Sequence, residues 1–122
     1  MSYTRRYSDT TDEMRAVTLL DNLLDTGVVD AADIALVTGS TVRSVARWAH
    51  GTPPRRQAED RLLELKAVVD LLGQVLDDEP AANWLRTPNP DLGYDKPIDL
   101  LTEGQYRRVI GSLLAIAEGV TA

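Results

Sequence analysis

The residues best suited to chemistry in this chain are four arginines that lie between positions 41 and 57. No acidic residue occurs in this stretch, although the whole chain has a formal net charge of −6. A guanidinium group can bind guanine O6 and N7 through two parallel N–H donors, or it can bind a backbone phosphate. Because DNA responds to the local field of the docking face, an acidic protein can still present a basic footprint. The four residues are Arg43, Arg47, Arg55 and Arg56.

The chain contains no comparable set of residues for catalysis. The chain has no cysteine, and its single His50 cannot found a histidine-based metal site or a conventional triad. No glycine-rich phosphate loop and no nucleophile elbow occurs in the sequence. Carboxylates are paired at Asp77 and Asp78 and at Asp91 and Asp95, but in turns, where solvated charge is the expected account. We therefore predict that the protein is not an enzyme and that it holds no cofactor or metal.

The elements that must position the arginines are two short helices joined by a turn, over residues 30–51. Asp30 is predicted to cap the first helix, which ends before Gly39, and Ser40 or Thr41 is predicted to cap the second. Two short helices with a glycine-containing turn between them are the layout of a helix-turn-helix. Its second helix enters the DNA major groove.

The second of these helices should have an inward and an outward face. Val45 and Trp48 lie three residues apart and are expected to pack into the core. Arg55 and Arg56 follow a Pro-Pro turn and suit phosphate contacts, whereas the N-terminal residues of the helix meet base edges. Val42 could touch a thymine methyl group or simply pack. The predicted DNA contacts are Thr41, Arg43, Ser44, Arg47, Arg55 and Arg56.

Two more helices are expected before the last third of the chain. A first helix should end near Gly27, and a longer one should run from about Pro54 to Leu76. Because the longer helix is apolar over much of its surface, we expect it to be covered on several sides and to form a spine. Residues 77–80 should end it, before a short helix over residues 81–85. Its main stripe is Ala58, Leu62, Leu65, Val69, Leu72 and Leu76, with Leu63 apart.

The segment that follows is rich in proline but too apolar to be a linker. Pro88, Pro90 and Pro97 each lack an N–H and push the preceding residue toward extended geometry, which excludes a long helix there. Several apolar or aromatic side chains in this segment require cover. They are Trp84, Leu85, Leu92, Tyr94, Ile98, Leu100 and Leu101.

A last helix is expected to begin near Gln105 and to end at Gly119. Val120, Thr121 and Ala122 would then remain as a free apolar tail. The apolar stripe of this helix is broader than a single packing contact needs. It comprises Tyr106, Val109, Ile110, Leu113, Leu114, Ile116 and Ala117.

These elements carry a family resemblance. The chain reads W-L-x2-P-N-P-x-L from Trp84, then K-P-x-D-L-L from Lys96, then G-x-Y-x-R-V from Gly104, and its last helix ends A-E-G-V. This series resembles the toxin-binding domain of Xre/MbcA/ParS-type antitoxins, closely over roughly the last forty residues and in layout over the whole chain. Several spaced elements in one order are more specific than one short motif. Residues 30–51 resemble the Xre-type DNA-binding motif, from which Ser40 departs because that position is usually apolar.

The resemblance implies a function and a partner. Antitoxins of this family partner RES-domain toxins, which degrade NAD⁺, and the family relationship implies that the carboxyl end covers the toxin's NAD⁺ entrance. Inhibition would then be steric. The antitoxin would also repress its own promoter, as a two-fold dimer that presents two recognition helices to operator DNA. The implied toxin contacts are Arg107, Arg108, Glu118, Gly119, Val120, Thr121 and Ala122.

Together these observations predict an all-α protein. Residues 1–60 should form an N-terminal helical domain with the helix-turn-helix, residues 61–79 a connecting helix, and residues 80–122 a toxin-binding domain. No secretory signal and no apolar run of membrane-spanning length is visible, so we expect a soluble cytoplasmic protein that forms a homodimer and a hetero-oligomer with its toxin.

Two other interpretations stay open from the sequence. One is a transcriptional regulator whose C-terminal domain dimerises or binds a small ligand. The other is an antitoxin, or another interaction protein, whose helix-turn-helix is a remnant that no longer binds DNA and whose arginines are only a solvated face. The acidic net charge supports this last interpretation, because a negatively charged protein is repelled by DNA.

Overall fold

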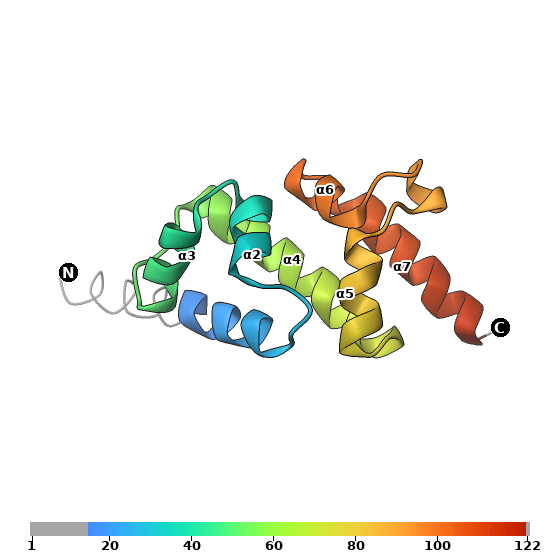
Figure 1. Ribbon diagram of the computed structural model, residues 1–122, viewed down its shortest axis with the longest axis horizontal. Helices are drawn as coiled ribbons and strands as arrows, with labels where there is room; N and C mark the ends of the chain where they lie inside the picture. The colour runs from blue at the N-terminus through green and yellow to red at the C-terminus, as the bar shows by residue number, and fades with distance from the viewer. Residues whose placement is uncertain (1–14, 122) are drawn as a thin grey trace, which may run out of the picture.

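The computed structural model describes the backbone of residues 15–121 and the side chains of residues 15–119. Within this range the chain is helical and contains no β-strand, and an isolated antiparallel bridge joins Asn89 to Asp95. The predicted all-α class is therefore confirmed. The elements are a helix over residues 15–25, α2 (Ala31–Thr38), α3 (Val42–Ala49), α4 (Arg56–Val75), α5 (Asp78–Arg86), the 3-10 helix η1 (Pro90–Leu92), α6 (Pro97–Thr102) and α7 (Tyr106–Thr121) (Figure 1).

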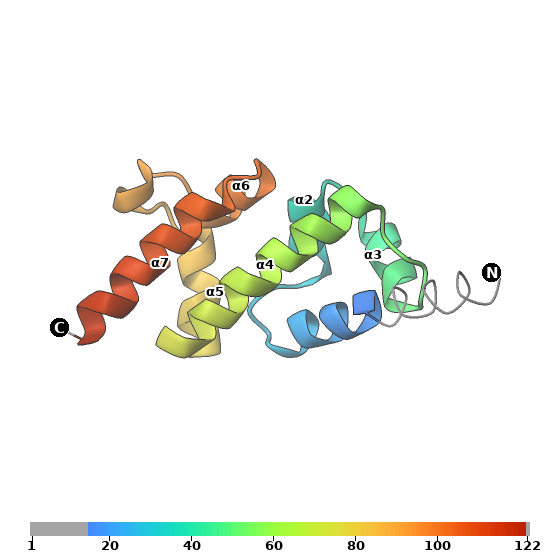
Figure 2. The same ribbon diagram turned by 180° about the vertical axis from the view of Figure 1, so that it is seen from behind.

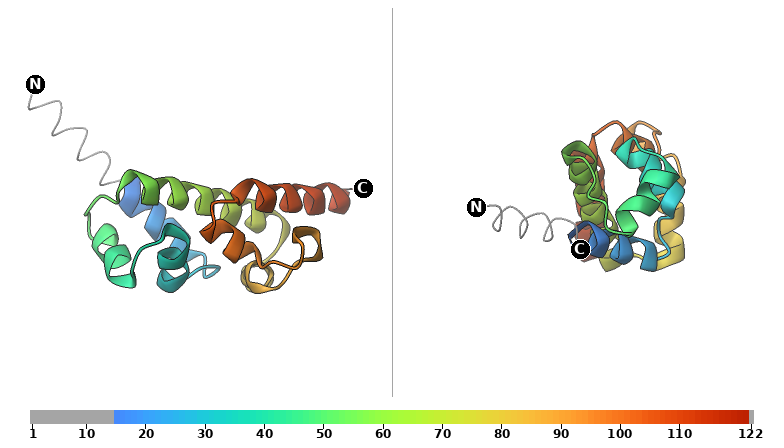
Figure 3. Two further views of the ribbon diagram at one scale, coloured as in Figure 1. Left: turned by 90° about the horizontal axis from the view of Figure 1, so that it is seen from above. Right: turned by 90° about the vertical axis from the view of Figure 1, so that its left-hand side faces the viewer.

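The molecule is elongated, and α4 runs diagonally through it. The helix over residues 15–25, α2 and α3 lie at one end, while α5, η1, α6 and α7 lie at the other (Figures 1 and 2). Seen from above, α4 and α7 follow one long edge, with α2, α3 and α6 along the opposite side (Figure 3). Since α4 contacts α2, α5, α6 and α7, it joins the two ends as the predicted spine.

The buried face of α4 explains this role. Leu62, Leu65, Val68 and Leu72 are fully buried, and Leu63 is 43% exposed, so the predicted stripe and the exception to it are both confirmed. Fully burying one such side chain stabilises the fold by about 1.5–3 kcal/mol. The helix ends at Val75, and the next residue, at position 76, is its partly buried C-cap.

The helix caps of the N-terminal end follow the sequence. The Asp30 carboxylate caps α2 by accepting a hydrogen bond from the Asp33 N–H. The Asp33 carboxylate in turn accepts from the Asp30 N–H, which completes a capping box. Gly39 lies in the left-handed region at φ 70° and closes α2, as only glycine does at no steric cost. Thr41 caps α3 through a hydrogen bond from the Ser44 N–H. These predictions are confirmed, except that α3 ends at Ala49, two residues before the expected stop.

Two predicted helix boundaries are wrong. Residues 77–80 do not separate two helices, because Asp78, Glu79 and Pro80 form the first turn of α5. The first-turn N–H groups of a helix have no internal partner, so proline is tolerated there, and acidic side chains favour the positive end of the dipole. Gly119 does not end α7, which continues through it to Thr121. Glycine costs a helix only about 1 kcal/mol relative to alanine, too little to stop it without a left-handed cap.

The proline segment is compact, as expected, with one exception. Leu85, Leu92, Leu100 and Leu101 are buried between α4, α5 and α7, whereas Tyr94 is 71% exposed. Tyr94 also has φ 67°, a conformation that costs an L-residue roughly 1–2 kcal/mol. Hydrogen bonds of the turn hold it there, including one from the Tyr94 N–H to the Asn89 carbonyl at 2.8 Å.

Candidate functional site

A basic depression lies beside the N-terminus of α3. It has a volume of about 500 Å³ and lies between α3 and the first turn of α4. Four of the six predicted DNA contacts line it, while Arg43 and Arg56 stand outside its lining. The Pro-Pro turn after α3 brings the two helices together, because Arg55, the N-cap residue of α4, shares this surface with Arg47. The four lining residues are Thr41, Ser44, Arg47 and Arg55.

Hydrogen bonds hold three of these side chains in place. The Thr41 hydroxyl accepts from the Ser44 N–H at 3.0 Å and donates to the Ser44 hydroxyl at 3.1 Å. One Arg47 Nη also donates to that hydroxyl, at 3.1 Å. Arg47 is thus drawn along the helix toward its N-terminus, where its remaining donors face solvent. Such an arrangement suits an anionic oxygen, because the amides and dipole of the helix N-terminus add to the guanidinium charge.

The outer face of α3 carries Val42 and Arg43. Val42 is 52% exposed, so it does not pack into the core and remains available to an apolar partner such as a thymine methyl group. Arg43 is exposed and makes no hydrogen bond or ion pair within the described part of the chain. On the inner face Val45 and Trp48 are buried, as predicted, with exposures of 1% and 6%.

Sequence reasoning missed four polar residues of this depression, of which Thr38, the last residue of α2, is buried. Ser40 precedes α3, Thr52 follows it, and Gln57 lies in the first turn of α4. The doubled proline at positions 53 and 54 was the available signal, since a short rigid turn must fold α4 back beside α3. Ser40 replaces the apolar residue typical of the motif, and the structure places it on this polar surface.

Those predicted toxin contacts whose side chains the structure describes lie on α7, at its two ends. Arg107 and Arg108 are exposed in the first turn, where one Arg108 Nη donates to the Gln105 amide oxygen at 2.9 Å. Glu118 and Gly119 are exposed near the other end, about 16 Å further along the helix. Eleven residues are just over three helical turns, so the two pairs lie on the same side of α7.

The carboxyl end of α7 projects from the molecule. Among the side chains described up to residue 119, Leu113 is the last fully buried one of the helix, and Leu114 is already 47% exposed. The last turns run past the other helices of this end (Figures 1 and 3). Val120 and Thr121 continue the helix, while their side chains and all of Ala122 lie outside the described residues. The end expected as a free tail is therefore helical up to Thr121.

A third surface was not predicted. A mostly apolar depression of about 270 Å³ lies between the proline segment and α7. Trp84, Asn89 and Ile116 are its half-buried members, and the remaining lining comes from exposed residues among positions 87–91. The half-buried tryptophan in the W-L-x2-P-N-P series was the signal that could have indicated it.

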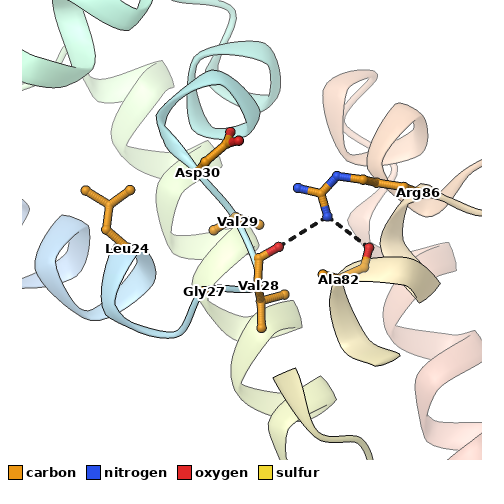
Figure 4. Close-up of a pocket in the computed structure, with 7 residues that line it drawn as sticks. All are labelled: Leu24, Gly27, Val28, Val29, Asp30, Ala82 and Arg86. Atoms are coloured by element: carbon orange, nitrogen blue, oxygen red, sulfur yellow. Dashed lines mark hydrogen bonds between the residues drawn. The ribbon is translucent and has the colours of Figure 1, made fainter. Parts of the chain in front are cut away.

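The two ends of the molecule meet at a cleft of about 510 Å³, into which Arg86 points (Figure 4). One Nη of Arg86 donates to the Ala82 carbonyl at 2.9 Å and to the Val28 carbonyl at 3.3 Å. The other Nη pairs with the Asp33 carboxylate. Because these partners engage both ends of the guanidinium group, Arg86 joins α5 to the segment before α2 rather than presenting a free cation to a ligand.

The same network affects one carboxyl group. A hydrogen bond from the Asp33 backbone N–H holds the pKa of Asp30 below its ordinary value; partial burial opposes the shift, and the Asp33 side chain and the Arg86 charge reinforce it. Asp30 is therefore ionised at neutral pH, and its carboxylate oxygen accepts the capping hydrogen bond. The described residues contain no group of three or more His, Cys, Asp or Glu that could hold a metal ion. None of the helices described is long and apolar enough to span a bilayer.

Comparison with known proteins gives consistent results. Residues 70–119 match the antitoxin Xre/MbcA/ParS C-terminal toxin-binding domain. The chain is 40% identical over 89 residues to the mycobacterial cidal antitoxin MbcA of Mycobacterium tuberculosis, which covers 72% of this chain and 79% of the relative. A probable mycobacterial cidal antitoxin of the same species is 30% identical over 106 residues, covering 87% and 90%.

A solved structure is also similar. A chain of the crystal structure of the Mycobacterium tuberculosis MbcT–MbcA toxin–antitoxin complex superposes with a TM-score of 0.77 and 34% sequence identity. The match covers 85% of this chain and 95% of that chain, so it includes both ends of the molecule.

Proposed function

The chain belongs to the Xre/MbcA/ParS family of antitoxins, and we propose that it neutralises a cognate RES-domain toxin, an NAD⁺-degrading enzyme, by covering its active site. Family membership favours an antitoxin over a regulator with a ligand-binding C-terminal domain. The single observation that carries the mechanism is the projecting end of α7, which leaves the core after Leu113. A single helix end can enter a concave site from which a globular surface is excluded.

The residue types of this end suit insertion. Ala115, Ala117 and Gly119 keep the last turns of α7 thin, and Glu118 is the one charged residue there. The apolar Val120 follows directly in the sequence. The proposed inhibition is steric: the helix end fills the substrate site of the toxin, and Arg107 and Arg108 contact the toxin beside it. Steric inhibition needs no catalytic group on the antitoxin.

We propose further that the protein represses its own operon through the basic depression and the outer face of α3. Arg43 would read bases, and Arg47 and Arg55 would contact backbone phosphates. Two copies related by a two-fold axis would present two α3 helices to half-sites about one helical turn of DNA apart. What supports this role is the convergence of Thr41, Ser44, Arg47 and Arg55 on one acid-free surface.

Co-expression with the RES enzyme tests the antitoxin function. We expect the full chain to restore growth and to preserve cellular NAD⁺, and continued NAD⁺ loss would contradict neutralisation. Deleting residues 119–122 should abolish inhibition while a complex still forms on a size-exclusion column. If the shortened chain inhibits as well as the full chain does, the steric mechanism is wrong but the antitoxin role stands. The variant Leu36→Lys, an exposed residue of α2 at the other end of the molecule, is the control.

A further inference from the structure

The depression between the proline segment and α7 has the properties of a protein-docking site. Its volume is about 270 Å³, just under the roughly 300–1,000 Å³ typical of small-molecule pockets. That space suits one or two large side chains. Asp91, at the rim, is the one charged residue of its lining. The occupant that fits is therefore an apolar side chain of another protein rather than a charged metabolite.

The rim of this depression is fixed before anything binds. The Asn89 side chain accepts from the Asp91 N–H at 2.9 Å, and the Asn89 N–H donates to the Asp95 carbonyl at 3.1 Å. The Thr87 hydroxyl donates to the Asn83 carbonyl at 2.6 Å. Pro88 and Pro90 restrict the backbone further. Binding here would cost little ordering entropy, which is the usual benefit of a preorganised surface.

The floor of the depression carries residues of the type that dominates protein interfaces. Trp84 packs against the core on one side and remains partly exposed toward the depression on the other. Half-buried tryptophan in a preformed pocket is a common binding hot spot. Ile116 belongs to the part of α7 that follows Leu113 and lies about one turn before residues 119–122, so one partner can reach both features.

We propose that this depression is an anchor for the cognate toxin: it receives an apolar side chain of the toxin and holds the complex together, while the end of α7 blocks the active site. This inference rests on the proposed function. Its basis is that the depression adjoins the blocking end and that its whole lining lies within residues 70–119, the part that matches a toxin-binding domain. Affinity and inhibition then reside in two separable places on the antitoxin.

Two variants test the anchor through affinity. Ile116→Lys places a charge in the depression, and Thr87→Trp fills it from an exposed rim position. We expect each to raise the Kd for the purified RES toxin by about 10-fold or more. The control is Leu63→Lys, an exposed apolar residue of α4 outside the depression and outside residues 70–119, which should leave the Kd within about 2-fold.

A second readout separates anchoring from blocking. At saturating antitoxin, the two depression variants should still inhibit NAD⁺ cleavage completely, whereas the chain without residues 119–122 should bind but not inhibit. A thermal melt of each variant confirms folding, and Ile116→Val should keep the affinity of the unchanged chain.

The outcomes distinguish the two proposals. If the unchanged chain binds the toxin and both depression variants bind within 2-fold of it, the anchor is refuted and the antitoxin function stands. If Leu63→Lys weakens binding as much as Ile116→Lys, the anchor is also refuted. If the unchanged chain does not bind the RES toxin, both the proposed function and the anchor are refuted.

Discussion

Arg86 of α5 and Asp33 of α2 form an ion pair although they are 53 positions apart in the sequence. The same guanidinium group donates to the carbonyls of Val28 and Ala82, and the same carboxylate accepts from the Asp30 N–H. One side chain of α5 is thereby tied to the capping box of α2. The position of α2 relative to α5 depends on this link as well as on the shared spine α4.

Replacing Arg86 with methionine should lower the free energy of unfolding by about 1–2 kcal/mol. The variant loses hydrogen bonds to a carboxylate and to two carbonyls but keeps much of the aliphatic packing, and Arg86 is 40% exposed, which limits the effect. Urea denaturation measures it. The control is Arg56→Met: Arg56 is exposed and makes no hydrogen bond or ion pair within the described range, so its change should stay within about 0.5 kcal/mol. Equal effects of the two variants would contradict a structural role for the link.

Stability should fall at acidic pH because of Asp30. Its pKa is lowered in the folded state, mainly by the hydrogen bond from the Asp33 N–H. A lowered pKa contributes stability above the unfolded value of about 3.9, and this contribution is lost as the pH falls through the folded value. Asp30→Asn keeps a cap without a titrating charge, so its stability should fall less between pH 5 and pH 3 than that of the unchanged chain.

The comparison with Asp30→Ala isolates the cap itself. Alanine removes the capping hydrogen bond, so this variant should lose about 1 kcal/mol at pH 7. Urea midpoints at pH 7, 5 and 3 give all three curves. If Asp30→Asn and the unchanged chain lose the same stability as the pH falls, then other carboxylates, not Asp30, cause the loss of stability in acid.

Gly104 should not tolerate alanine. It has φ +82°, and a Cβ there would collide with the Arg61 guanidinium group, which lies against the turn between α6 and α7. The guanidinium group is the end of a flexible side chain and can move aside, so the cost comes mainly from the left-handed conformation, and Gly104→Ala should lower the free energy of unfolding by roughly 1–2 kcal/mol. Gly73→Ala is the matched control. Gly73 lies exposed in α4 with nothing near a built Cβ, so alanine should stabilise the protein there by about 0.5–1 kcal/mol.

Most of the fold could be predicted because local chemistry dictated it. Asp30, Gly39 and Thr41 are residues whose types are selected by helix ends, and their roles were confirmed. The spacing of Leu62, Leu65 and Leu72 gave the length and the buried face of α4 because one stripe must face the core.

The errors arose where two local signals compete or where tertiary contacts decide. The acid–proline run at 77–80 is typical of both a helix end and a helix start, and only the packing of α5 decides between them. Gly119 was expected to stop a helix that continues through it. The ion pair between Arg86 and Asp33 and the depression beside Trp84 depend on the crossing of distant helices, which no local pattern encodes.

The arginines of the basic surface should have separable effects on operator binding. Arg43 stands on the outer face of α3, so Arg43→Ala should weaken binding to the operator by about 1–3 kcal/mol and relax the sequence preference. Arg55 lines the depression, so Arg55→Ala should weaken binding to all DNA and lower the salt slope by about one. Titrations of operator and scrambled duplexes at several salt concentrations measure both effects.

The same titrations test whether this acidic chain binds DNA through its arginines at all. Lys66→Ala removes a cation that already pairs with Asp70 on α4, away from this surface, and should leave DNA binding unchanged. If Arg43→Ala, Arg47→Ala and Arg55→Ala all behave like Lys66→Ala, the helix-turn-helix is a remnant and the toxin-binding end carries the function alone.

Two buried hydroxyl groups should respond in opposite directions to removal. Ser112 in α7 is 7% exposed, and its Oγ has no hydrogen-bond partner within the described part of the chain. Thr38 in α2 is 9% exposed, and its hydroxyl donates to the Ile34 carbonyl at 2.7 Å. A buried hydroxyl without a partner costs about 1–3 kcal/mol, whereas a satisfied one contributes about 0.5–1.5 kcal/mol. Ser112→Ala should therefore raise the free energy of unfolding by about 1 kcal/mol, and Thr38→Val should lower it by about 0.5–1 kcal/mol. Urea denaturation measures the stability of both variants. A loss of stability in Ser112→Ala would show that the Ser112 hydroxyl does have a hydrogen-bond partner, such as a bound water.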